Sequence, residues 1–442
     1  MRELVRKFLS LGIILLLALS VAASAQQISF AGIWTRLPVT GAPSARYYAL
    51  VASDASGRVV CFGGSNEGGA LNDTWIWDGT NWAQQFPVNS PPARSNGAMA
   101  SDVSGQVILF GGFTPDGDLR DTWTWDGTNW KQQFPAGSPS ARSGASMAAD
   151  GSGHVLLFGG TIENSRMVND TWIWDGTNWT QQSPAHSPGG REAPSMASDH
   201  SRHIVLFGGM NENSRMLNET WTWDGTNWTQ QSPANSPGAR QSAAMASNAS
   251  GNIVLFGGYP GFGATDLDDT WIWDGTNWKQ QHTASGPSAR TEPALIYYSP
   301  GHAPGQVMLF GGTSQGALND TWVYEDSSAN FGTVKLGSRT TLILSFNIQL
   351  PVALSAVKVL QSQPSNLDFT LNGASTCSGN LNADSSCTVR VTFSPRSPGL
   401  RTGAVQIIDN TGAMLASTAI FGQGLGPAAV SRPARPTRRR TR

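Results

Sequence analysis

The sequence predicts an all-β protein: a six-bladed β-propeller closed by its N-terminal strand, followed by a β-sandwich. Three observations predict this fold. A unit with four short strand-like segments recurs six times, at spacings of 48 to 54 residues. Glycine is abundant, only 13% of residues are charged, and no long stretch has the apolar periodicity of a helix. After residue 330 the repeat stops and a second pattern of alternating strands begins.

The first 25 residues have the layout of a secretory signal peptide. Arg2, Arg6 and Lys7 form a basic start, residues 11–21 form a short apolar run, and Ala23-Ser24-Ala25 is a small-residue cleavage site. No later stretch reaches about 18 continuous apolar residues, so we expect no transmembrane segment. We therefore expect an exported protein, secreted or periplasmic, with attachment to the cell surface left open.

The repeat is marked by the tripeptide Phe-Gly-Gly, which begins at Phe62, Phe110, Phe158, Phe207, Phe256 and Phe310. Each copy contains a small-residue strand, a turn, an apolar strand that ends in Phe-Gly-Gly, a variable loop, and a ten-residue segment such as DTWIWDGTNW at 170–179. Four short antiparallel strands of this kind make one propeller blade. The small residues suit the crowded centre of a propeller, and the tryptophans suit the wider spaces farther out.

The N-terminal strand is expected to complete the last blade. The sixth copy lacks the final tryptophan of the ten-residue segment, whereas the segment around Trp34, ahead of the first copy, matches that missing strand. Pairing it with the last copy would join the two ends of the ring and remove an exposed sheet edge.

These repeats resemble the kelch motif, whose marks are a Gly-Gly pair after an apolar strand and two spaced aromatic residues. Gly111-Gly112, Trp125 and Trp130 carry the resemblance in the second copy. The resemblance covers about residues 30–330 and implies a propeller similar to the central domain of galactose oxidase; we assign residues 26–330 to this domain. Because kelch propellers serve as adaptors, enzymes and scaffolds alike, the resemblance implies fold more strongly than function.

An arginine opens every copy: Arg46, Arg94, Arg142, Arg191, Arg240 and Arg290. Symmetry places them near one mouth of the channel, where a guanidinium ring would bind carboxylates, as arginines do in kelch adaptors. The alternative is structural, with each arginine capping loop carbonyls or pairing with an acid of a neighbouring blade. The sequence leaves both interpretations open.

The loops that follow Phe-Gly-Gly vary most between copies, and we expect them to border the same mouth and to carry specificity. Tyr259 and Phe262 are the aromatic side chains we expect to be exposed there. The variable loops are residues 65–72, 113–120, 161–169, 210–218, 259–268 and 313–319.

The favoured function is a non-enzymatic binding or scaffold protein with a protein or carbohydrate ligand at this mouth. The alternative is a carbohydrate-active enzyme that resembles the kelch-like sialic-acid mutarotases and uses Glu192 and Glu292 as general acid and base. No catalytic motif is assigned, and the copper and Cys–Tyr chemistry of galactose oxidase has no counterpart. We expect no cofactor and no metal.

Residues 331–426 are predicted to form an immunoglobulin-like sandwich. In CTVRVTFSP, the residues Cys387, Val389, Val391 and Phe393 would face the core, whereas Thr388, Arg390 and Thr392 would face solvent. With FGTVKLG and the closing FGQG, this segment resembles the ASPM/SPD-2/Hydin and bacterial choice-of-anchor D domains, which implies an adhesion or spacer module. A disulfide between Cys377 and Cys387 is expected from their spacing in an exported protein.

The charge distribution separates the folded body from the tail. The formal charge is −1, but the first 25 residues carry +2 and residues 427–442 carry +6, which leaves −9 on residues 26–426. The arginine-rich tail is expected to be disordered, with either an anionic surface as its partner or no binding role. We expect a monomer.

Overall fold

A computed structural model describes residues 28–150, 152–199, 203–299, 306–326, 328–361 and 368–426. The expected signal peptide, residues 1–25, and the basic tail, residues 427–442, lie outside these ranges. The chain divides into two compact units, one of which comprises Trp34–Gln281 and Ser285–Glu325. Within the described ranges, no helix is both long enough and apolar enough to cross a membrane.

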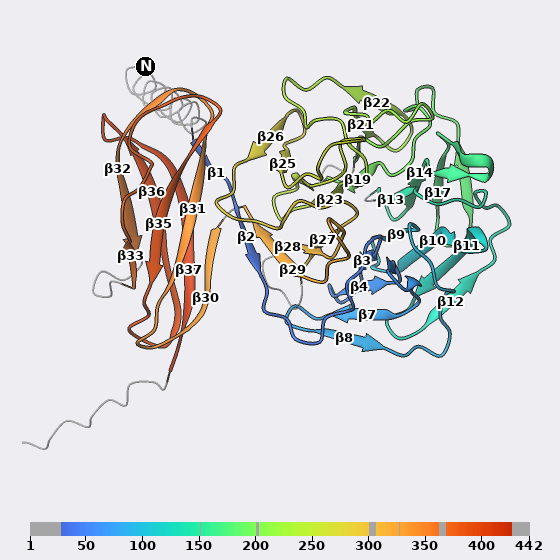
Figure 1. The fold of residues 1–442 in the computed structure, drawn as a ribbon, viewed down its shortest axis with the longest axis horizontal. Coiled ribbons are helices and arrows are strands. Elements are labelled where there is room, and N and C mark those ends of the chain that lie inside the picture. Colours follow the sequence, from blue (N-terminus) through green and yellow to red (C-terminus); the bar gives the residue numbers. More distant parts are fainter. Residues whose placement is uncertain are drawn as a thin grey trace, which may run out of the picture. The chain divides into compact units, whose positions relative to one another are not determined.

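The first unit is a six-bladed propeller, and every blade is an antiparallel four-stranded sheet (Figure 1). Small residues and methionines on the innermost strands line a central cavity of about 300 Å³. The innermost strands are β3 (Leu50–Ser53), β9 (Ala98–Ser101), β13 (Ser146–Ala149), β19 (Ser195–Ser198), β23 (Ala244–Ser247) and β27 (Ala294–Tyr298). The second strands are β4 (Val59–Phe62), β10 (Val107–Thr114), β14 (Val155–Phe158), β20 (Ile204–Phe207), β24 (Ile253–Phe256) and β28 (Gln306–Phe310).

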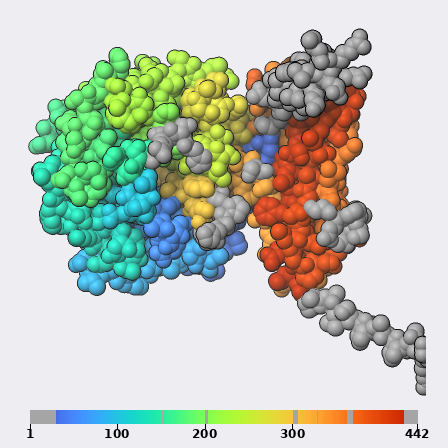
Figure 2. Space-filling model, turned by 180° about the vertical axis from the view of Figure 1, so that it is seen from behind, coloured from blue at the N-terminus to red at the C-terminus, as the bar shows by residue number. Residues whose placement is uncertain are grey.

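The two outer strands of each blade come from the tryptophan-rich segment. The third strands are β7 (Thr74–Trp77), β11 (Gly117–Trp125), β17 (Thr171–Trp174), β21 (Thr220–Trp223), β25 (Thr270–Trp273) and β29 (Thr321–Glu325). The fourth strands are β8 (Trp82–Gln85), β12 (Trp130–Gln133), β18 (Trp179–Gln182), β22 (Trp228–Gln231), β26 (Trp278–Gln281) and, for the last blade, β2 (Ile33–Arg36). The expected closure by the N-terminal strand is therefore confirmed, and Figure 2 shows the blades following one another around the ring.

The tryptophans fill the space between neighbouring sheets. Trp174 and Trp179 pair across β17 and β18 with ring centroids 5.4 Å apart, and Trp179 packs edge-on against Phe110 of the preceding blade. The Trp179 Nε1–H also donates a 3.0 Å hydrogen bond to Thr122 Oγ1 of that blade. Equivalent indole–hydroxyl bonds cross the other five blade junctions, from Trp34, Trp82, Trp130, Trp228 and Trp278. The ten-residue segment is thus the packing unit of the ring.

The variable loops add short elements beside the blades. They include the two-residue strands β5 (Ser65–Asn66), β6 (Gly69–Ala70), β15 (Thr161–Ile162) and β16 (Arg166–Met167), and the 3-10 turn η1 (Glu163–Ser165). In the second blade, β10 and β11 instead continue past the sheet as one hairpin.

The second unit is a sandwich of two sheets around one apolar core that includes Leu344, Val391 and Phe393. One sheet has the order β1 (Ile28–Phe30), β31 (Thr340–Ile348), β35 (Ser385–Phe393) and β33 (Phe369–Leu371). The other has the order β30 (Ser328–Lys335), β37 (Met414–Leu425), β36 (Gly399–Asp409), β32 (Val352–Gln361) and β34 (Gly379–Leu381). Cys377 and Cys387 form a disulfide within this unit.

Two details differ from the sequence-based expectation. Strand β1 falls in the segment assigned to the propeller, 26–330, but it pairs with β31 of the sandwich. Thr392 was expected to face solvent, yet its side chain is buried. Its hydroxyl is hydrogen-bonded to Thr341 and Asn372. Strict alternation fails at Thr392 because these polar partners satisfy a buried hydroxyl.

Thr122→Val tests the bonds between blades. We expect the free energy of unfolding to fall by about 1–3 kcal/mol, because the buried indole of Trp179 loses its acceptor. Urea denaturation followed by tryptophan fluorescence reports on the propeller alone, since all 17 tryptophans lie in the repeat region. Thr180→Val, an exposed change on β18, is the control and should stay within about 0.5 kcal/mol of wild type. Equal effects of the two changes would contradict the assignment.

Candidate functional site

One residue from each blade forms a ring at one mouth of the channel, and each lies two positions after the arginine of its copy. This mouth ring consists of Tyr48, Asn96, Gly144, Ala193, Ser242 and Glu292. All six have left-handed backbone conformations, with φ between 48° and 65°. For residues other than glycine this conformation costs on the order of 1 kcal/mol or more, so surrounding contacts must hold it.

Backbone hydrogen bonds between neighbouring blades hold the mouth ring. The Ser242 amide donates to Ala193 O at 3.0 Å, and the Glu292 amide donates to Ser242 O at 2.9 Å. Corresponding bonds run from Tyr48 to Glu292, from Gly144 to Asn96 and from Ala193 to Gly144. The left-handed turn aims these five amides at the preceding blade, which fixes where the ring side chains begin.

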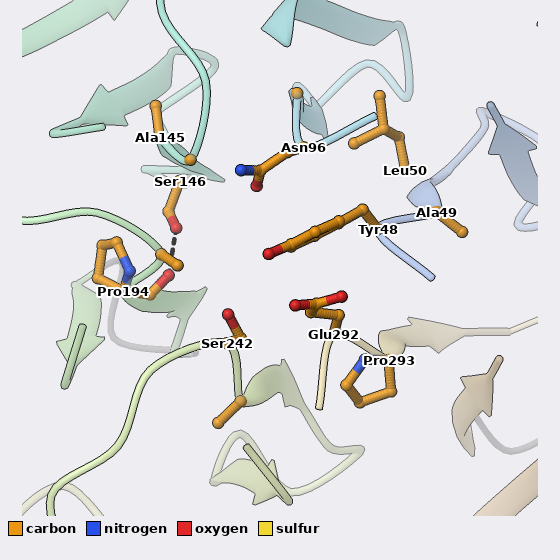
Figure 3. A pocket seen from close by; sticks show the side chains of 14 residues that line it. Tyr48, Ala49, Leu50, Asn96, Ala145, Ser146, Pro194, Ser242, Glu292 and Pro293 are labelled. Carbon is orange, nitrogen blue, oxygen red and sulfur yellow. Dashed lines mark hydrogen bonds between the residues drawn. The ribbon is translucent and has the colours of Figure 1, made fainter. Parts of the chain in front are cut away.

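The mouth ring surrounds a pocket of about 180 Å³ (Figure 3). Apolar side chains also contribute to its walls, from Ala49, Leu50, Ala145, Pro194, Ala243 and Pro293. The Tyr48 hydroxyl, the Glu292 carboxylate and the Ser242 hydroxyl point toward the same central space. Ser146 also lines the pocket, but its hydroxyl donates to Pro194 O.

The Glu292 carboxyl has an unusual electrostatic environment. Burial raises the pKa of Glu292 to about 7; hydrogen bonding by Tyr48 opposes this shift, and the charge of Asp266 adds to it. Burial and the charge of Glu292 also raise the pKa of Tyr48, so its phenol stays protonated and can donate to the carboxylate. Near neutral pH the Glu292 carboxyl in this pocket is therefore partly protonated and partly ionised.

The variable loops border the mouth ring, as expected. The residue before each ring member makes a β-bridge with the first loop residue after Phe-Gly-Gly, for example Gln241 with Tyr259 and Ser95 with Phe113. Phe262 is fully exposed at the tip of its loop, whereas Tyr259 is half-buried. The ring and the six loops form one continuous face, called the loop face below.

The six arginines do not form the expected anion-binding ring. Their side chains are at most 2% exposed, and each guanidinium contacts an acid at 2.5–2.7 Å. The pairs are Arg46–Asp73, Arg94–Asp121, Arg142–Asp170, Arg191–Glu219, Arg240–Asp269 and Arg290–Asp320. The structural alternative holds, except that the acid comes from the arginine's own blade.

Each guanidinium also donates to two backbone carbonyls. The five guanidinium N–H groups of Arg142 donate to Ser140 O, Ser140 Oγ, Gly159 O and both carboxylate oxygens of Asp170. Burial alone would raise the pKa of Asp170, but the hydrogen bond and charge of Arg142 outweigh it and hold that pKa below its usual range. An arginine engaged in this way has no donor left for a ligand.

Glu192 and Glu292 do not share the pocket. Glu292 lines it, whereas the Glu192 carboxylate accepts a 2.6 Å hydrogen bond from Thr161 Oγ1 in the variable loop of the preceding copy. The enzyme alternative required both acids at one ligand, and the structure does not bring them together there. No group of three or more His, Cys, Asp or Glu side chains within the described ranges could hold a metal ion.

Sequence reasoning named Glu292 but missed the other polar residues of the mouth ring and the acids that pair with the arginines. An acid precedes Thr-Trp in all six copies, which could have identified the arginine partners. Tyr48, Asn96 and Ser242 occupy a position that differs in every copy, two residues after an invariant arginine. The contrast between an invariant arginine and a variable residue two positions later could have indicated the mouth ring. The left-handed backbone of these residues could not have been predicted from the sequence.

Comparison with known proteins supports the repeat assignment. The KLHDC2/KLHL20/DRC7 Kelch-repeats domain matches residues 30–184, 80–224 and 176–341 in overlapping segments. That family consists in general of non-catalytic scaffolds. No curated protein matches the chain significantly. The resemblance of the C-terminal segment to ASPM/SPD-2/Hydin and choice-of-anchor D domains stays a prediction.

Arg142→Ala should lower the free energy of unfolding by about 3–5 kcal/mol, because Asp170 would be left largely buried without its partner. Since the pKa of Asp170 is lowered, the pair stabilises the fold above about pH 4 and this contribution is lost in acid. The difference between variant and wild type should therefore shrink toward pH 2–3 in urea titrations. Arg166→Ala, an exposed arginine of the same copy, is the control. Equal losses for both arginines would contradict the assignment.

Glu292→Gln should stabilise the protein at alkaline pH. Because the pKa of Glu292 is raised from 4.5 to about 7, the native state resists ionisation and loses stability as pH rises through this window. The variant should exceed wild type by up to about 3 kcal/mol at pH 8 and by nothing at pH 4. Urea denaturation at both pH values measures this, with exposed Glu67→Gln as control. A gain that is the same at both pH values would show that ionisation is not its cause.

Proposed function

We propose, from the premise that this chain belongs to the KLHDC2/KLHL20/DRC7 kelch-repeats family, that it is an exported scaffold whose loop face binds a protein ligand. Kelch repeats of this kind indicate a protein-binding propeller. We choose the loop face as the binding surface because its residues differ between copies, whereas the residues of the blades are nearly uniform. Arginine, the double glycine and the tryptophans recur from copy to copy, whereas the ring and loop residues do not.

This contrast has a physical reason. The repeated residues satisfy one another inside and between blades, so each substitution there disturbs a shared packing arrangement. The ring and loop side chains contribute little to that packing and can differ freely. Rigid blades that carry varied loops are the usual arrangement of a binding surface.

Exposed aromatic side chains on the loop face also support a protein ligand. Phe262 is fully exposed, and Phe113 of the second blade is 49% exposed. Aromatic residues on a rigid framework are frequent energetic centres of protein interfaces. A carbohydrate ligand, the other partner considered from the sequence, is treated as an outcome of the test below.

Export is supported by the layout of the first 25 residues and by the Cys377–Cys387 disulfide. Disulfides persist mainly in oxidising compartments. Detection of the processed chain outside the cytoplasm would test this part of the proposal separately from binding.

The binding proposal can be tested by selecting displayed 12-residue peptides on the full chain, with a glycan array in parallel. We expect selected peptides to lose at least about tenfold in affinity on Phe262→Ala, as truncation of an interface aromatic does. Val103→Ala, an exposed apolar change in the turn at the opposite end of β9, is the control. Peptides that bind Phe262→Ala as tightly as wild type, or binding to glycans alone, would overturn the proposal.

A further inference from the structure

We propose that the pocket inside the mouth ring receives a single cationic group, a lysine ammonium or an N-terminal amine, contributed by the protein ligand. This inference rests on the proposed function and names the chemistry that the loop face recognises. Four observations support it: an acid without a basic partner, a buried hydroxyl without a hydrogen bond of normal length, an acidic rim and apolar side chains in the wall.

The first observation is the Glu292 carboxylate. No ion pair among the described residues joins it to a base, and its charged neighbour Asp266 is another acid. The six arginines lie only two positions before the ring, but their charges are already balanced by their own carboxylates. A cation in the pocket would therefore meet an acid that no side chain neutralises.

The second observation is the Ser242 hydroxyl. Ser242 is 8% exposed, and its oxygen is buried without a hydrogen bond of normal length, although it lies near enough to Tyr48 to lower the pKa of the phenol. It points into the same space as the Glu292 carboxylate (Figure 3). An ammonium group has three donors and no acceptor. Glu292, Ser242 and the Asn96 amide oxygen together offer it three acceptors.

The third observation is the charge of the rim. The six variable loops contain seven acidic and three basic residues. An acidic rim around a low-dielectric opening concentrates cations and repels anions. It therefore favours a basic ligand over the acidic one that the arginines had suggested.

The fourth observation is the shape of the wall. Leu50, Ala145 and Pro293 supply an apolar surface, against which the alkyl stem of a lysine can pack while its charge reaches the acceptors. The Tyr48 ring adds an aromatic surface beside the carboxylate, which is favourable for a cation. Among the described residues, no cluster of three or more His, Cys, Asp or Glu side chains could hold a metal ion instead.

The protonation of Glu292 links this site to pH. The groups that act on it are Tyr48 of the first blade, which opposes the rise of its pKa, and Asp266 of the fifth copy, which adds to it. Because only the ionised carboxylate attracts a cation, affinity should rise between pH 6 and pH 8. By reciprocity, a bound cation should lower the pKa of Glu292.

A titration with n-butylammonium chloride tests the site directly. The full chain would be labelled with carboxyl-¹³C glutamate, and the resonance that disappears in Glu292→Gln is assigned to Glu292. We expect saturable shifts with butylammonium, a lower pKa for Glu292, and no saturation with butanol or butyrate. Glu292→Gln should weaken butylammonium binding at least about tenfold and Ser242→Ala about threefold, followed for all variants by the Leu50 methyl resonances. Glu192→Gln is the matched control and should bind within twofold of wild type.

Three results would overturn the inference: binding of butanol or butyrate as strong as that of butylammonium, no saturable shift, or unchanged affinity in Glu292→Gln. Near-UV circular dichroism would show whether each variant is folded. If Glu292→Gln does not fold, the affinity of Ser242→Ala for butylammonium becomes the test of the site. Failure here, with peptide binding still sensitive to Phe262, would remove the cation site and leave the proposed function intact. Conversely, peptide binding that is unchanged by Phe262→Ala would contradict the proposed function, whatever the outcome of the butylammonium titration.

Discussion

The buried arginine–carboxylate pair is the interaction on which the rest of the propeller depends. The backbone of Arg142 is bonded to the preceding blade, through Leu119 O and the Gly112 amide, whereas its guanidinium is bonded to its own blade. One residue therefore joins two sheets. The Phe-Gly-Gly motif follows from the same contact, because a Cβ on Gly111, at φ +61°, would lie 2.7 Å from Arg142 O. Only glycine allows the neighbouring backbone to approach so closely.

This arrangement separates stability from recognition. The six arginines are neutralised by acids inside their own blades, and the tryptophans pack between neighbouring blades. What reaches solvent at the mouth is a set of residues that the blades hold by backbone bonds rather than by side-chain packing. The strained turns at Tyr48, Ser242 and Glu292 persist because those bonds fix them. Side chains at these positions are free to carry chemistry, and in this chain they make the mouth acidic rather than basic.

Much of the fold could be predicted from the sequence because the repeated residues are suited to only a few backbone conformations and packing environments. Gly-Gly pairs, small inner strands and paired tryptophans indicate blades, and the displaced match around Trp34 indicates closure. The candidate site could not be predicted in the same way. The sequence around Arg142 is consistent with either an exposed or a buried guanidinium. Its contact with Asp170 decides between them, and the two residues lie 28 positions apart in the sequence. The pocket role of Glu292 depends on its left-handed backbone. Glu192 lies one position earlier in its own copy, and its carboxylate bonds Thr161 instead.

A double-mutant cycle on Arg142→Met and Asp170→Leu tests the central claim most directly. Unfolding free energies of the wild type, both single variants and the double variant give the coupling between the two side chains, free of their separate packing effects. If the buried pair anchors Arg142 within its own blade while the Arg142 backbone bonds the preceding blade, the coupling should be about 2 kcal/mol or more, and the double variant should be more stable than either single variant. Additive effects, with a coupling near zero, would show that the arginine acts independently of the acid and would contradict the account.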